Sequence, residues 1–189
     1  MENCSNLENY ILAIVFLPYW FRLAQCFRRY HDCKLKVHLI NAGKYFSMIL
    51  IHFSNIFKYK IQGDTTYWTF IVMSIISTIY AYSWDLYMDW GLLRSTACGK
   101  MFLRPKLLLP IWFYYYAIVS NLFLRLAWIL IYFKFLPDWL HSTQILAITI
   151  CVGEGFRRAQ WSLIRLENEQ VNNFEKYRTF LDIPSVKED

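Results

Sequence analysis

The chain has 189 residues, of which 57% are hydrophobic and 20% aromatic, and its formal net charge is +6. This composition excludes an ordinary soluble domain, and the length leaves room for a single membrane unit. Most Lys and Arg residues fall between the apolar segments, where such charges orient helices in a membrane, so nucleic acid is not expected as a partner. We therefore expect an all-α fold, a polytopic helical membrane bundle.

The apolar segments predict about four or five transmembrane or interfacial helices. They are expected near 8–30, 37–57, 66–90, 107–135 and 139–175. Except for the first, each is long enough to cross a hydrocarbon layer of about 30 Å. The first contains Pro18 and runs into basic residues, so it is either a short span or a span that bends into an interfacial helix. A single domain over 1–180 and a short cytosolic tail over 181–189 are expected.

Basic residues between the helices predict how they are oriented. They precede the second helix at Arg22, Arg28, Arg29, Lys34 and Lys36, and they separate the third from the fourth at Arg94, Lys100, Arg104 and Lys106. Positively charged loops favour the cytosolic side, which places both loops and the carboxy terminus in the cytosol. The expected location is the plasma membrane or the Golgi, as a multi-pass membrane protein.

Charged side chains also occur inside or at the rim of the apolar segments, where they are costly without a function. Arg125 lies near the middle of the apolar run 107–134. The others are Lys44, Asp85, Asp89, Glu154, Arg157 and Arg158. Helical spacing predicts that Asp85 and Asp89 share one helix face, and that Glu154 shares another with the two arginines that follow it. These faces are expected to meet around a hydrated path.

The chemistry of this path suits an oxyanion such as phosphate or sulfate. Arg presents a planar fork of donors that binds two anion oxygens at once, and the carboxylates would hold the arginines when the path is empty. Tyr45 adds a hydroxyl beside Lys44, and Trp128 follows Arg125 by three residues on the same helix face. The alternative is that the charges only anchor the bundle and that Trp128 only packs.

Several features argue against an enzyme. The five cysteines contain no CxxC pair and the four histidines are dispersed, so no metal and no cofactor are expected. An intramembrane enzyme that uses Glu154 or Asp85 as acid or base is a weak alternative, because no nucleophile accompanies them. The small residues around Gly43 favour close helix packing over substrate contact.

Several longer motifs resemble one family. They are PYWFRLAQCFRRYHD, HLINAGKY, YSWDLYMDWGLL, YYYA, LRLAWIL and EGFRRAQWSLIRLENEQVNNFEKYR. In this order they resemble the EXS-type membrane domain of eukaryotic phosphate exporters, the family of the xenotropic and polytropic retrovirus receptor and the plant phosphate exporters. The resemblance implies a phosphate path with a gating aromatic at Trp128. Its lining would be Lys44, Tyr45, Asp85, Asp89, Arg125, Glu154, Arg157 and Arg158.

We therefore expect export of inorganic phosphate from the cytosol by channel-like uniport. Full members of the family also carry an SPX sensor domain and earlier membrane helices, which this chain lacks. It is thus expected to be a fragment or a shortened member. Inorganic phosphate and membrane lipids are the expected partners, together with either a second copy or a chain that supplies the upstream helices. The alternative is a non-transporting membrane scaffold or Golgi-retention factor.

Overall fold

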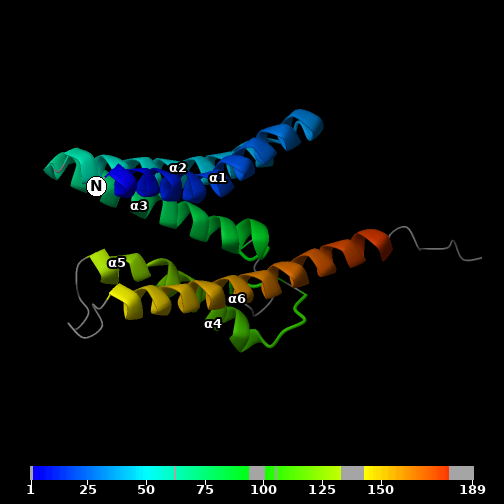
Figure 1. Ribbon diagram of the computed structural model, residues 1–189. Coiled ribbons are helices and arrows are strands. Elements are labelled where there is room, and N and C mark those ends of the chain that lie inside the picture. Colours follow the sequence, from blue (N-terminus) through cyan, green and yellow to red (C-terminus); the bar gives the residue numbers. More distant parts are fainter. Residues whose placement is uncertain (1, 62, 94–100, 105, 133–142, 179–189) are drawn as a thin grey trace, which may run out of the picture. The chain divides into compact units, whose positions relative to one another are not determined.

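The computed structural model describes residues 2–61, 63–93, 101–104, 106–132 and 143–178. Every regular element in these ranges is helical, which confirms the all-α class (Figure 1). The elements are α1 (Glu2–Cys33), α2 (Lys36–Ile61), α3 (Asp64–Trp84), the π-helix η1 (Asp85–Asp89), α4 (Ile111–Arg125), α5 (Ala127–Tyr132) and α6 (Thr143–Arg178). The tail expected over 181–189 lies outside the described residues. The chain divides into two compact units, Met1–Ala81 and Tyr82–Asp189, and each is described by itself.

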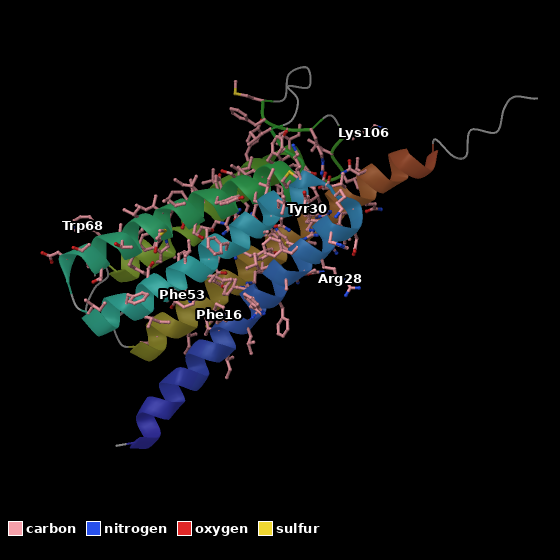
Figure 2. The ribbon with its side chains drawn as sticks, turned by 90° about the horizontal axis from the view of Figure 1, so that it is seen from above. Phe16, Arg28, Tyr30, Phe53, Trp68 and Lys106 are labelled. Atoms are coloured by element: carbon pink, nitrogen blue, oxygen red, sulfur yellow. The ribbon has the colours of Figure 1, made fainter. Side chains whose placement is uncertain are left out.

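In the first unit α2 packs along α1. Their shared core consists of Leu23, Cys26, Ala42 and Ile49, with Phe16, Tyr19 and Tyr45 packed against it. Figure 2 shows Phe16 of α1 and Phe53 of α2, whose ring centroids are 5.9 Å apart at an interplanar angle of 72°. Such an edge-to-face arrangement is favourable for two aromatic rings.

The part of α3 that belongs to the first unit approaches α2 closely. The Tyr80 hydroxyl donates a hydrogen bond to the Ile40 carbonyl, and a Cβ added at Gly43 would lie 2.8 Å from that hydroxyl oxygen. Ser47 Oγ on α2 is also 3.2 Å from Ser77 Oγ on α3. The absence of a side chain at Gly43 therefore permits this approach, as the small residues in the sequence predict.

The helix expected over 66–90 ends in a π-helical turn. α3 runs directly into η1, where Trp90 N donates to the Asp85 carbonyl at 2.8 Å, five residues back. Gly91 follows with φ of +65°, a conformation that favours glycine, and Leu92 N donates to the Leu86 carbonyl at 2.9 Å. Of the described helices, the continuous segment Asp64–Asp89 alone is long and apolar enough to cross a membrane. The larger number of spans stays a prediction.

The helix expected over 107–135 is shorter and interrupted. α4 begins only at Ile111, because Pro110 precedes it and a residue before proline, here Leu109, disfavours helical torsions. It ends at Arg125, since Leu126 leaves the helix with torsions of −87° and −1°, and α5 starts at the next residue. Arg125 is therefore the last residue of a helix.

The second unit has its own core, to which η1, α4 and α6 contribute. α4 packs along α6 (Figure 1). The buried core residues are Leu86, Trp90, Leu92, Leu103, Tyr114, Ala117 and Ile164. Beside this core the same elements enclose charged side chains, which form the candidate site.

Candidate functional site

The Asp85 carboxylate lies at the centre of the charges that the second unit brings together. Asp85 is 3% exposed. Its Oδ2 accepts hydrogen bonds from Arg125 Nη2 at 2.5 Å and from Asn121 Nδ2 at 3.1 Å, and Arg157 Nη1 lies 4.0 Å away. A buried carboxylate is tolerated when it is paired and hydrogen-bonded. Asp85 therefore joins η1 to the arginines of both α4 and α6.

Glu154 holds Arg157 in a fork of two hydrogen bonds. Arg157 Nε donates to Oε1 at 3.0 Å and Arg157 Nη2 donates to Oε2 at 2.8 Å. Arg158 Nε lies 3.6 Å from the same Oε2, but the Arg158 side chain is 74% exposed. The helical spacing thus places Glu154 between a buried and an exposed guanidinium group. We call Asp85, Asn121, Arg125, Glu154 and Arg157 the Asp85 cluster, with Arg158 at its rim.

Two polar atoms of the Asp85 cluster have no hydrogen-bond partner among the described residues. They are Arg125 Nε, a donor, and Asn121 Oδ1, an acceptor, and both atoms are buried. Both side chains come from α4, one helical turn apart. Arg125 also lies at the carboxyl end of α4, where the helix dipole favours a cation. The cluster thus retains hydrogen-bonding capacity beyond its internal pairs.

Asp89 contacts side chains of α6. Its Oδ2 accepts a hydrogen bond from Trp161 Nε1 at 3.1 Å, and its carbonyl accepts one from Asn168 Nδ2 at 3.0 Å. The expectation that Asp85 and Asp89 share a helix face stays a prediction. Both residues lie in the π-helix η1.

The remaining predicted site residues lie elsewhere. Lys44 and Tyr45 are on α2 of the first unit, where Lys44 is buried and its Nζ lies 4.9 Å from the centroid of the Tyr45 ring. Trp128 is half-buried on α5, beyond the break that follows Arg125. Their contribution to one path with the Asp85 cluster stays a prediction.

Sequence reasoning missed Asn121, although it is 1% exposed and contacts Asp85 directly. A neutral amide in an apolar helix does not stand out in the sequence as a charged residue does. Its spacing was the available signal, because Asn121 precedes Arg125 by four residues and so shares its face.

A second group of buried polar side chains was also missed. Arg104 Nη2 lies 2.7 Å from Glu167 Oε1, and these side chains are 8% and 5% exposed. Glu167 also accepts hydrogen bonds from Leu108 N at 2.7 Å and from the Tyr114 hydroxyl. Asn168 Oδ1 accepts one from Arg104 Nη1 at 2.8 Å. We call Arg104, Tyr114, Glu167 and Asn168 the Arg104 cluster. The sequence suggested only an orienting loop charge at Arg104, whereas the structure buries it.

The fold and the Asp85 cluster define a class of protein: a helical protein, apolar in composition, that buries arginines against carboxylates between helices. The EXS family matches residues 1–171, and the chain belongs to the EXS family. This confirms the resemblance. The chain is a membrane protein by family, and the family is one of transporters rather than enzymes.

Individual relatives agree with this membership. The chain is 40% identical, over 97% of its length, to "Phosphate transporter PHO1 homolog 9" of Arabidopsis thaliana, and it covers 23% of that protein. It is 40% identical over 95% of its length to "Solute carrier family 53 member 1" of Homo sapiens, of which it covers 27%. A "Xenotropic and polytropic retrovirus receptor 1 homolog" of Xenopus laevis is 36% identical over 95% of the chain, which covers 28% of that protein. The chain thus spans about a quarter of the length of these relatives.

Proposed function

We propose that this chain forms part of a path that exports inorganic phosphate from the cytosol by channel-like uniport. The observation that carries the proposal is the Asp85 cluster, in which two buried arginines from different helices meet one carboxylate. Family membership supports a transported solute, and a relative named as a phosphate transporter supports phosphate as that solute.

The charges of the cluster fit a divalent or monovalent oxyanion. Arg125, Arg157 and Arg158 bring three positive charges against the two negative charges of Asp85 and Glu154, which leaves one positive charge. A guanidinium group binds two phosphate oxygens at once, and Arg125 Nε is a buried donor with no partner among the described residues. The carboxylates compete with phosphate for the arginines, which favours release over tight capture.

In the proposed path Arg157 and Arg158 collect phosphate from the cytosol, and Lys44 and Tyr45 hold it at mid-depth. Arg125 passes it outward when Trp128 swings aside, while Asp85, Asp89 and Glu154 hold the basic side chains between passages. Export across an inside-negative plasma membrane needs no coupled ion, because each negative charge that leaves gains about 2.3 kcal/mol per 100 mV. The Golgi is the other proposed location, and a second copy or a further chain completes the path.

Efflux from liposomes tests this proposal. The chain is reconstituted in vesicles loaded with phosphate, and efflux is compared with Arg125→Ala and Arg158→Ala. Both variants are expected to slow efflux, the first more strongly because Arg125 is buried beside Asp85. Arg165→Ala is the matched control, since Arg165 is an arginine of α6 that pairs with Glu169 outside the cluster. Efflux unchanged by both test variants removes the assigned roles, and a folded chain without efflux favours the membrane scaffold.

A further inference from the structure

Asn121 combines deep burial with an incomplete set of hydrogen bonds. Its side chain is 1% exposed, and Nδ2 donates to Asp85 Oδ2 at 3.1 Å. Its Oδ1 is buried without a hydrogen-bond partner among the described residues. A buried acceptor that makes no hydrogen bond costs about 1–3 kcal/mol. An unpartnered acceptor at this position therefore points to a ligand that donates a hydrogen bond.

The chemistry of Asp85 fixes which way the Asn121 amide points. An ionised carboxylate only accepts hydrogen bonds, and Asp85 is ion-paired with Arg125. The amide must therefore direct its NH2 group at Asp85 and keep its carbonyl oxygen for another group. Arg125 Nε, the unpartnered donor of the same cluster, lies one turn further along α4, and both side chains contact the same Asp85 oxygen.

We infer that Asn121 is a specificity-determining residue that selects protonated oxyanions. In this arrangement Asn121 Oδ1 accepts the hydrogen of a P–OH group, while Arg125 Nε donates to an unprotonated oxygen of the same anion. This inference rests on the proposed function and deepens it. Phosphate keeps at least one proton at neutral pH, whereas sulfate has none.

Sulfate bound at this position would place its own lone pairs next to those of Asn121 Oδ1. That oxygen would stay without a donor, and a site that offers a buried hydrogen-bonding group discriminates strongly against a ligand that cannot use it. Arsenate, which has the shape and protonation of phosphate, should be accepted. The site therefore distinguishes anions by whether they carry a proton, and not by their size or their number of oxygens.

The test measures efflux of phosphate, arsenate and sulfate from liposomes that contain the full chain. The wild-type chain is expected to carry phosphate and arsenate in preference to sulfate. Asn121→Leu, which keeps the size but removes the acceptor, is expected to lower the ratio of phosphate to sulfate efflux by about tenfold, the value of one hydrogen bond. Arsenate should change together with phosphate.

Asn168→Ser and Asn121→Ser form a matched pair of smaller substitutions. Asn168 is also a buried amide of the second unit, but its Oδ1 already accepts hydrogen bonds from Arg104 and Asn172. Asn168→Ser should therefore leave the ratio of phosphate to sulfate efflux unchanged, whereas Asn121→Ser should lower it. This pair also serves if Asn121→Leu does not fold, which circular dichroism of the purified chain checks.

Each other outcome overturns the inference in a recognisable way. If both Asn121 variants slow phosphate and sulfate equally, Asn121 acts only by holding Asp85. If the wild-type chain carries sulfate as fast as phosphate, no selection by protonation exists, and this result needs no variant. If the wild-type chain carries none of the three anions and none raises its melting temperature in detergent, the proposed function itself fails.

Discussion

Asp85 on η1 and Arg125 at the end of α4 form an ion pair of 2.5 Å, with side chains 5% and 13% exposed. It links a π-helical turn to the last residue of a helix that stops immediately afterwards. Removing one partner of a buried pair leaves the other charge without compensation.

Asp85→Asn should therefore destabilise the second unit strongly, by about 3 kcal/mol. The double variant Asp85→Asn with Arg125→Gln should recover part of this loss, because no unpaired charge remains. Chemical denaturation of the purified chain in detergent measures both. Asp32→Asn is the control, since Asp32 is exposed and pairs only loosely with Arg28, and it should have little effect. A loss as small as that of the control would contradict the assignment of Asp85 as a buried anchor.

The Arg104 cluster predicts a large coupling between Arg104 and Glu167. Each of Arg104→Met and Glu167→Gln should cost about 3 kcal/mol, because the partner is left buried and unpaired, and the double variant should cost less than their sum. A double-mutant cycle on the free energy of unfolding gives the coupling. The exposed pair of Arg165 and Glu169, which lie four residues apart on α6, serves as the reference and should couple by only about 0.5 kcal/mol.

Gly91 predicts a difference between two glycine substitutions. Gly91→Ala should destabilise the chain by more than about 1 kcal/mol, because its φ is +65° and the new Cβ would lie 2.5 Å from Asn168 Oδ1. Gly155→Ala should stabilise it by up to about 1 kcal/mol, since Gly155 is helical and a Cβ there meets nothing within 4 Å. Thermal melts followed by circular dichroism compare them. Equal melting temperatures would show that Gly91 is not needed for the approach to Asn168.

Glu154→Gln should change how the proposed path holds phosphate. A neutral amide pairs with Arg157 more weakly than the carboxylate does, so phosphate should bind more tightly and half-maximal efflux should occur at a lower phosphate concentration. The concentration dependence of efflux from liposomes measures this. Glu169→Gln removes a carboxylate of the same helix outside the Asp85 cluster. It should leave the dependence of efflux on phosphate concentration unchanged.

Gly43→Ala should disturb the first unit through Tyr80. The new Cβ would lie 2.8 Å from the Tyr80 hydroxyl oxygen, which must then leave the Ile40 carbonyl. Because the displaced atom is the end of a side chain, we expect a modest loss of about 1 kcal/mol, similar to that of Tyr80→Phe. Denaturation of both variants and of the double variant tests the mechanism. Additive losses would show that the two positions act independently.

The sequence predicts helices well because long apolar segments with charged ends leave few alternatives. Spacing also places Glu154 correctly between Arg157 and Arg158, since α6 is regular there. At Asp85 to Asp89 the structure forms a π-turn, which a spacing rule written for an α-helix does not foresee. The pattern of hydrophobic residues alone does not distinguish these two kinds of helix.

Asn121 and Arg104 escaped prediction for a different reason. Whether a polar side chain is buried depends on which helices pack against it, and that is a property of the tertiary structure. Arg104 stands in a basic loop, where arginines are usually solvated, and only the return of α6 brings Glu167 to it. Similarly, Asn121 has an acceptor for its hydrogen bond only because η1 brings Asp85 to α4.

The break at Leu126 separates two residues of the predicted site. Because α5 starts anew at Ala127, Trp128 belongs to a separate six-residue helix. Arg125 is the last residue of α4 and is paired with Asp85. Leu126 N still donates to the Leu122 carbonyl at 3.0 Å, and Ile129 N donates to the Leu126 carbonyl at 2.9 Å, so hydrogen bonds continue across the break. The aromatic ring and the guanidinium group, three residues apart in the chain, thus belong to two helices that one residue separates.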